Sequence, residues 1–257
     1  MQPSNGLDRE GFIARLPASA LQVAFEPLLD ELRIRLVDAL GPALHSLYLY
    51  GSVARGEATP GVSDLDVTLV LAQAADAPLR ERLEAIRAEL QRQFPQVSKV
   101  DFDIGHLAQA LAPANRLSWG YWLRHQCRCV YGEDLGARFT SLPPSRAIAL
   151  ALNGDARAVL EEYAAAIEAA APTERLRLQR EAARKALRAT QVVRSDADDD
   201  WPLSLEQHAE WFLARYPEQR EATLALLEQA RSPSTSAEFS ALLRRFGRWL
   251  AETAGLA

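Results

Sequence analysis

The spacing of apolar and polar residues divides the chain into two parts with different patterns. In the first part, from about residue 20 to residue 135, helical and extended patterns alternate. Apolar residues recur at helical spacing from Leu21 to Leu40, and Gly41-Pro42 ends the predicted helix. A second helix is expected over Leu79–Phe94, because Pro78 can open it and Pro95 ends it. The alternation indicates a domain built from both helices and strands.

Three short segments of this part have the composition of β-strands. Residues 44–50 are apolar and aromatic. Residues 65–71 are nearly continuous in valine and leucine, which is typical of a strand in the centre of a sheet. Residues 98–104 alternate, with apolar side chains on one face and Asp101 and Asp103 on the other. The acidic face of this third strand is therefore a candidate for chemistry.

From Pro143 onward the pattern predicts helices alone. The expected helices, separated by prolines, span residues 145–170, 173–194, 204–216, 218–231 and 236–254. The Pro143-Pro144 pair marks the boundary between the two patterns. We therefore expect two domains, at residues 1–142 and 143–257.

Composition excludes several classes of protein. The 257 residues are 48% hydrophobic and 25% charged, as in a soluble globular protein. The formal net charge of -5 argues against a binder of duplex nucleic acid. No stretch approaches the ~18 apolar residues that span a bilayer, and the polar N-terminus does not resemble a signal peptide. Cys127 and Cys129 are expected to be reduced. These features predict a cytoplasmic protein that does not associate with membranes.

The loop after the first predicted strand has the features of a phosphate-binding turn. Gly51 allows a ligand to approach the backbone closely, and Gly56 allows the turn that follows. The N–H groups of the loop and the Ser52 hydroxyl can then hold phosphate oxygens. A Gly-Ser pair after a strand is more often a simple turn. The loop therefore indicates phosphate binding only in combination with the acidic residues that follow it.

Acidic residues follow at the start of the second and third predicted strands. Asp64 and Asp66 are two residues apart, so on a strand both carboxylates point to one side. Two carboxylates held together repel each other unless a cation or a proton lies between them. Oxygen ligands of this kind suit Mg²⁺ that also binds phosphate groups. Asp101 can add a third carboxylate, and the set indicates metal-assisted phosphoryl or nucleotidyl transfer.

Gly51-Ser52 with Gly56, then residues 63–66 (Ser-Asp-Leu-Asp), then Asp101, resembles the signature of the polymerase-β-type nucleotidyltransferase superfamily. The resemblance covers about residues 44–104. It implies an α+β fold, with a small mixed sheet and flanking helices followed by a helical bundle.

Within that superfamily the chain is most similar to the aminoglycoside nucleotidyltransferases, of the type that modifies streptomycin and spectinomycin. Residues 131–135 (Tyr-Gly-Glu-Asp-Leu) resemble the segment that closes the nucleotidyltransferase domain in many members. A C-terminal helical domain of similar length follows. Residues 205–231 also resemble the helical domain of those enzymes in residue pattern, although few residues are identical.

The resemblance implies a catalytic and metal-binding set of Asp64, Asp66 and Asp101. Asp64 and Asp66 would bind two Mg²⁺ ions that hold the triphosphate of ATP or another nucleoside triphosphate. Asp101 would help to bind the catalytic metal and to deprotonate an acceptor hydroxyl, which attacks the α-phosphorus and releases pyrophosphate. Asp103 shares the face of Asp101 and stays an alternative third carboxylate.

Basic and polar residues complete the expected nucleotide site. Lys185 and Arg188 are three residues apart on one predicted helix, so they share a face that could meet the triphosphate. A solvated helix face is the alternative for this pair. The residues expected to bind the nucleotide are Gly51, Ser52, Arg55, Ser63, Lys185 and Arg188.

The acceptor is expected between the two halves of the chain, since ligand sites favour domain interfaces. The acidic residues 198–200 beside Trp201 would suit a cationic acceptor, and a solvated acidic loop is the alternative. Trp119, Tyr121 and Trp122 are expected to pack in a core rather than to stack on the acceptor.

The expected function is Mg²⁺-dependent transfer of a nucleoside monophosphate, AMP from ATP, to a hydroxyl acceptor similar to an aminoglycoside, an activity of EC 2.7.7 type. Two alternatives stay open. One is the same chemistry on a protein or tRNA, as in toxin–antitoxin nucleotidyltransferases, although those are usually shorter. The other is a catalytically silent nucleotide-binding module, which the presence of every expected carboxylate disfavours.

Overall fold

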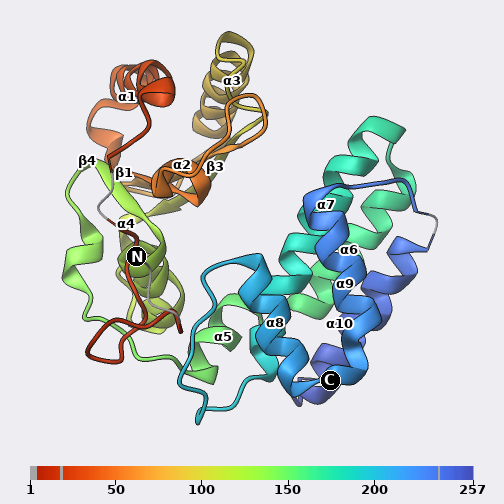
Figure 1. Ribbon diagram of the computed structural model, residues 1–257. Coiled ribbons are helices and arrows are strands. Elements are labelled where there is room, and N and C mark those ends of the chain that lie inside the picture. Colours follow the sequence, from red (N-terminus) through yellow and green to blue (C-terminus); the bar gives the residue numbers. More distant parts are fainter. Residues whose placement is uncertain (1–4, 18–19, 237, 257) are drawn as a thin grey trace. The chain divides into compact units, whose positions relative to one another are not determined.

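The structure is a computed structural model that describes residues 5–17, 20–236 and 238–256 of the chain (Figure 1). Its contacts divide the chain into two compact units. The first unit contains Phe12–Leu142, and the second contains Pro143–Ala257 together with the described residues 5–11. Each unit has its own hydrophobic core.

The assignment of residues 5–11 differs from the expected domain boundaries, which put them in the first domain. The Asn5 carbonyl accepts a hydrogen bond from the Trp201 N–H at 2.8 Å, and the Asn5 amide donates to the Asp199 carbonyl at 3.2 Å. Gly6 has φ +72°, and a Cβ there would lie 1.7 Å from the Trp201 carbonyl oxygen. Backbone pairing that requires a glycine therefore joins this segment to the helical unit.

The first unit is built on a four-stranded sheet. Its strands are β1 (Leu44–Tyr50), β2 (Leu65–Leu71), β3 (Val100–His106) and β4 (Arg128–Gly132), in the order β3-β2-β1-β4. β2 and β3 run parallel, whereas β1 is antiparallel to both β2 and β4. This mixed sheet confirms the predicted α+β fold class.

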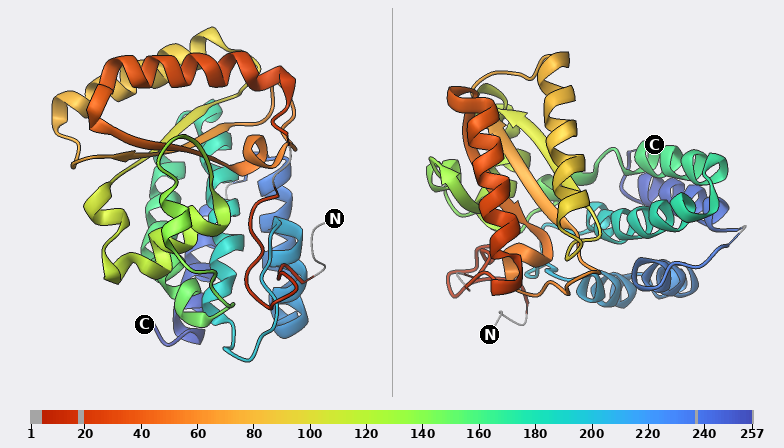
Figure 2. Two further views of the ribbon diagram at one scale, coloured as in Figure 1. Left: turned by 90° about the vertical axis from the view of Figure 1, so that its left-hand side faces the viewer. Right: turned by 90° about the horizontal axis from the view of Figure 1, so that it is seen from above.

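Two long helices, α1 (Glu26–Leu40) and α3 (Ala77–Gln93), lie on one face of the sheet (Figure 2). Short 3₁₀ turns flank α1 at Val23–Phe25 and Gly41–Ala43. Leu28, Leu32 and Leu36 recur every four residues along α1 and are fully buried. Burial of one such side chain contributes about 1.5–3 kcal/mol, so the helical spacing of the leucines determines the face that packs on the sheet.

Side chains of the opposite sheet face pack against the segment that follows β3. Tyr48 and Val70 form a second cluster there with Ala110, Leu123 and Leu135. The segment contains α4 (Leu107–Ala110), 3₁₀ turns at Pro113–Asn115 and Leu135–Arg138, and π-helical turns at Arg116–Gly120 and Trp122–Gln126.

From Pro143 onward, the described residues of the second unit contain helices and no strands, as predicted. α10 packs along α6, α9 packs along α7, and α6 packs against α7. Its helices are α5 (Arg146–Asn153), α6 (Ala156–Ala169), α7 (Pro172–Ala189), α8 (Leu205–Arg215), α9 (Arg220–Arg231) and α10 (Phe239–Thr253), with 3₁₀ turns at Thr190–Val193 and Pro217–Gln219.

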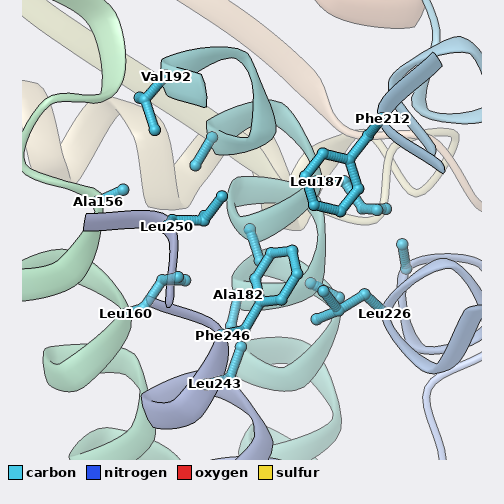
Figure 3. Packing of buried hydrophobic residues seen from close by; sticks show 14 of the residues in the cluster. Ala156, Leu160, Ala182, Leu187, Val192, Phe212, Leu226, Leu243, Phe246 and Leu250 are labelled. Carbon is cyan, nitrogen blue, oxygen red and sulfur yellow. The ribbon is translucent and has the colours of Figure 1, made fainter. Parts of the chain in front are cut away.

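Small residues on α7 determine how closely the helices of this unit pack. Ala182, Ala183 and Ala186 are fully buried, and the aromatic rings of Phe212 and Phe246 fill the space around them (Figure 3). The helix expected over residues 145–170 is interrupted, since α5 ends at Asn153 and α6 starts at Ala156. Glycine at position 154 weakens a helix at this point.

No helix in the described ranges has the length and apolar character needed to cross a bilayer.

Candidate active site

The turn after β1 brings its backbone against a carboxylate of β2. The short helix α2 (Gly51–Arg55) begins directly after Tyr50, and Gly56 ends it in the left-handed conformation at φ 72°. Gly51 has φ +69°, and a Cβ there would lie 2.0 Å from Asp66 Oδ2. Only glycine satisfies both the conformation and the space. The turn therefore holds its backbone in close contact with the Asp66 carboxylate.

Strand register brings Asp66 and Asp101 together. In the parallel pair of β2 and β3, Asp66 is the partner of Asp101, and across β1 Asp66 is the partner of Tyr50. Neighbouring strands lie about 5 Å apart, so the two carboxylates stand side by side on one sheet face. We call Asp66 and Asp101 the carboxylate row. Like charges at this spacing raise the energy of the site unless a cation lies against them.

Asp64 lies just before β2, where a serine fixes its carboxylate. The Ser98 hydroxyl oxygen lies 2.5 Å from Asp64 Oδ1 and 2.9 Å from the Val62 carbonyl oxygen, so the single hydroxyl proton is shared between these two acceptors. Ser63 accepts a hydrogen bond from the Thr59 N–H at its hydroxyl oxygen, at 2.9 Å. Within this structure the Ser63 hydroxyl thus stabilises the loop before β2, while Asp64 is held at the edge of the carboxylate row.

Lys99 forms an ion pair with the carboxylate row. Its ammonium lies 2.7 Å from Asp101 Oδ1, and the two side chains are 25% and 35% exposed. The Lys99 carbonyl accepts a hydrogen bond from the Leu65 N–H at 2.8 Å, which fixes the backbone of the lysine beside the start of β2. The row therefore has a cation of the chain itself within contact distance of one of its carboxylates.

Asp103 has different surroundings from Asp101. Its partner across β2 is Thr68 rather than an aspartate. Burial raises the pKa of the Asp103 carboxyl, while a hydrogen bond donated by the Tyr50 hydroxyl opposes that rise. Burial, with the nearby charge of Asp103 second, also raises the pKa of Tyr50, so its hydroxyl stays protonated and able to donate.

An aromatic residue of the π-helical segment contacts two neighbours of Asp103, Tyr50 and Thr68. The rings of Tyr50 and Trp122 meet edge to face with their centroids 4.7 Å apart. The Trp122 indole N–H donates to the Thr68 hydroxyl at 3.0 Å. Trp122 thus packs against the sheet face beside Asp103, in agreement with the expectation of core packing for this residue.

The remaining residues predicted to bind the nucleotide have partners of their own. Arg55 donates from Nε to Glu57 at 2.8 Å. The backbone carbonyl of Ser52 accepts from the Glu57 N–H at 3.0 Å, so Ser52 helps to close the turn. Lys185 and Arg188 belong to α7 of the second unit. Lys185 Nζ donates to Asn153 Oδ1 at 2.9 Å, and burial lowers the pKa of its ammonium.

The acidic segment at residues 198–200 is largely neutralised within the second unit. Arg215 lies 2.6 Å from Asp200 and 3.2 Å from Asp198, carboxylate to guanidinium. Arg194 donates to the backbone carbonyls of both aspartates and stacks 4.9 Å from the centroid of the Trp201 ring. We call residues 198–200 the acidic loop. Its contacts favour a structural role over the cradle for a cationic acceptor that its sequence suggests.

Sequence reasoning missed two neighbours of the carboxylate row, Tyr50 and Lys99. The signal for Lys99 lies in the alternation of β3, which points residues two apart to the same side. Lys99 therefore shares the side of Asp101. Tyr50 could not be found this way, because only the pairing of β1 with β2 brings it opposite Asp66.

The donor atoms around the carboxylate row determine whether a divalent cation fits this site. Among the described residues, no group of three or more His, Cys, Asp or Glu has the arrangement of a metal site. The chemistry of the donors nevertheless fits a hard cation, since the carboxylate row offers oxygen ligands from two strands. The absence of a side chain at Gly51 lets Asp66 Oδ2 lie against the backbone of the turn, 2.0 Å from where a Cβ would stand.

Comparisons with known proteins agree with this geometry. Residues 30–102 match the family described as nucleotidyltransferase domain, a stretch that contains β1, α2, β2, α3 and the start of β3. Among solved structures, the chain is similar to spectinomycin adenyltransferase AAD(9) from Enterococcus faecialis, determined with ATP and spectinomycin. The TM-score is 0.55 at 12% identity, covering 89% of this chain and 98% of that one. No curated protein sequence matches the chain.

Proposed function

We propose that the chain transfers AMP from ATP to a hydroxyl of a small molecule. The premise is that residues 30–102 form a nucleotidyltransferase domain of the polymerase-β type, which makes the chain a transferase of EC 2.7.7 type. The observation that supports this proposal most directly is the convergence of Gly51, Asp66 and Asp101. A glycine turn meets one carboxylate, and strand register brings a second carboxylate beside it. Such an arrangement suits the phosphates of a nucleotide and the cations that accompany them.

The proposed reaction follows from these positions. Mg²⁺ ions bound by the carboxylates would neutralise charge on the phosphates and stabilise the attacking and leaving oxygens. The backbone of the Gly51 turn, with Ser52 and Arg55, would hold the outer phosphates. Ser63, Lys185 and Arg188 stay predicted nucleotide contacts. Asp64 and Asp66 would hold the donor in place, and Asp101 would orient the acceptor hydroxyl and take up its proton. A bond forms between the acceptor oxygen and the α-phosphorus, the bond from that phosphorus to the bridging oxygen breaks, and pyrophosphate leaves.

Asp101 is the better candidate than Asp103 for the third carboxylate. Asp101 is the register partner of Asp66, whereas Asp103 is the partner of Thr68 and accepts the Tyr50 hydroxyl. Asp103 lies on the same sheet face beside Tyr50 and Trp122. We therefore assign it to the acceptor side of the site rather than to the donor.

An aminoglycoside-like molecule is the proposed acceptor. The support is the fold shared with spectinomycin adenyltransferase AAD(9), whose structure was determined with ATP and spectinomycin. The acidic loop adds little to this choice, since two of its carboxylates already pair with Arg215. The acceptor class thus rests on the fold and not on a complementary charge.

The test is a transfer assay with purified protein, radiolabelled ATP, Mg²⁺ and a panel of aminoglycosides and aminocyclitols. We expect a labelled acceptor and pyrophosphate in equal amounts, both lost in the Asp66→Asn and Asp101→Asn variants, with Asp103→Asn keeping more activity than Asp101→Asn. Label on a protein or tRNA in place of the small molecule would replace the proposed acceptor. Absence of ATP binding and of pyrophosphate release would overturn the proposal. Loss in Asp103→Asn alone would reverse the assignment of the third carboxylate.

A further inference from the structure

Lys99 is one of only two lysines in a chain whose Lys and Arg residues total 29. Its ammonium lies 2.7 Å from Asp101, a carboxylate that the proposed function assigns to the transfer reaction. An arginine would present a rigid planar fork to that carboxylate, whereas a lysine presents a compact charge on a flexible stem. The choice of lysine at this position therefore favours a contact that can be broken.

The carboxylate row needs a counter-ion when no other cation is bound. Asp66 and Asp101 are register partners on neighbouring strands, so their charges repel. Arg87 also acts on this position, since Asp101 helps to raise the pKa of its guanidinium, behind the larger effect of Glu84. The Arg87 guanidinium is engaged by Glu84 and donates to the Val100 carbonyl at 3.1 Å. Lys99 is thus the cation in direct ion-pair contact with Asp101.

We propose that Lys99 is a positioning residue that neutralises Asp101 until a divalent cation displaces it, and that it thereby sets the cation affinity of the site. Lys99 and a divalent cation compete for the oxygens of the Asp101 carboxylate, so each weakens the binding of the other to Asp101. The partly exposed Lys99 side chain can leave Asp101 without unfolding β3, because the backbone of Lys99 is held separately by the Leu65 N–H. The inference rests on the proposed function, since it takes the carboxylate row as the cation site.

The first test measures Mn²⁺ binding to the purified chain without nucleotide, by the electron paramagnetic resonance signal of free Mn²⁺. Lys99→Met is expected to tighten binding by roughly three- to fivefold, the size expected from a partly exposed ion pair. Arg92→Met removes one positive charge from the same unit, at an arginine whose side chain is 79% exposed, and should leave the affinity unchanged. In an Asp101→Asn background, Lys99→Met should have no effect.

Several outcomes separate this inference from the proposed function. If Asp66→Asn weakens Mn²⁺ binding while Lys99→Met behaves like Arg92→Met, the role of Lys99 is overturned and the cation site stands. If the wild-type chain binds no Mn²⁺, both the inference and the cation requirement of the proposed function are overturned. Lys99→Met is expected to act only through Asp101. If it also tightens Mn²⁺ binding in the Asp101→Asn background, the proposed displacement of Lys99 from Asp101 is overturned.

A second measurement needs no destabilising variant. With lysine labelled selectively with ¹³C, the chain has two lysine side-chain signals by nuclear magnetic resonance, from Lys99 and Lys185. The Lys99→Arg variant, which keeps the cation, assigns the Lys99 signal by its loss. Addition of Mg²⁺ should shift the Lys99 signal and leave that of Lys185 in place. A Lys99 signal that does not move at Mg²⁺ concentrations that saturate the site would contradict the inference.

Discussion

The carboxylate row of the first unit and the acidic loop of the second have similar composition and opposite contacts. In the acidic loop, Arg215 lies against Asp198 and Asp200, and Arg194 holds the loop backbone. In the carboxylate row, Asp66 and Asp101 are register partners, and the direct ion pair shown by Asp101 is made by a single lysine.

The difference shows that an acidic cluster is defined by its counter-ions and not by its sequence. Guanidinium groups that donate to several oxygens fix the acidic loop as part of the fold. In the carboxylate row, a lysine on a flexible stem pairs with Asp101, and both of these side chains are partly exposed. A single lysine contact is exchanged for another cation more easily than a guanidinium that pairs with two carboxylates.

The largest expected effect contrasts one aspartate from each cluster. Asp66→Asn should lower the rate of nucleotide transfer by at least about 100-fold, because it removes charge from the position where the phosphates bind. Asp200→Asn should keep the transfer rate within about threefold of wild type, since its carboxylate pairs with Arg215. Steady-state kinetics with circular dichroism as the folding control measures both. Equal losses in the two variants would remove the distinction between the clusters.

A pair of glycine variants tests the close contact between Gly51 and the Asp66 carboxylate. Gly51 and Gly61 have similar φ angles, +69° and +77°, so alanine at either should cost about 1–2 kcal/mol of stability. A Cβ at 51 also meets Asp66 Oδ2 at 2.0 Å, whereas nothing lies within 4 Å of one at 61. Gly51→Ala should therefore lower transfer about 100-fold and Gly61→Ala hardly at all, as kcat/KM would show. Similar activities in the two variants would mean that the contact between Gly51 and Asp66 has no role in nucleotide transfer.

Removal of Arg215, the cation that pairs with two carboxylates of the acidic loop, tests whether the loop is structural. Arg215→Met should lower the free energy of unfolding by about 1–3 kcal/mol, because it leaves Asp198 and Asp200 without their guanidinium partner. The KM for a cationic acceptor should stay unchanged if the loop is structural. Urea denaturation and acceptor kinetics provide the two readouts. A lower KM without loss of stability would instead indicate that the acidic loop binds the acceptor.

The pH dependence of stability extends the contrast to the two units, each of which holds a buried histidine. Burial lowers the pKa of His125 to about 4 in the first unit, and that of His208 to about 3 in the second. Below an unfolded pKa of about 6.5 the unfolded chain binds protons that the folded chain does not. Stability should therefore fall with pH from about 6.5 down to these values, by at most about 1.4 kcal/mol per pH unit for each histidine. His125→Gln and His208→Gln should each flatten the profile, measured by urea denaturation at several pH values. An unchanged slope in both variants would contradict this origin.

Local patterns were sufficient for much of the fold. β1 and β2 span the predicted residues, and α1 and α3 begin and end within a few residues of the predicted positions, because leucine spacing and flanking glycine or proline are local signals. β4 was not predicted. It is short and becomes a strand only by pairing with β1. The break between α5 and α6 at Gly154 and the π-helical turns at 116–126 also escaped prediction.

The candidate site divides in the same way. Residue types and spacing along the chain were enough to select Gly51, Asp66 and Asp101 as candidates for phosphate and cation chemistry. The tertiary structure decided which of the acidic residues stand together. Strand register pairs Asp66 with Asp101, which forms a partly exposed ion pair with Lys99, whereas Arg215 joins Asp198 and Asp200 within the acidic loop. The physical reason is that a carboxylate's chemistry depends on the charges that surround it, and strand pairing and the turns of the chain, which the spacing of acidic residues does not reveal, bring those charges together.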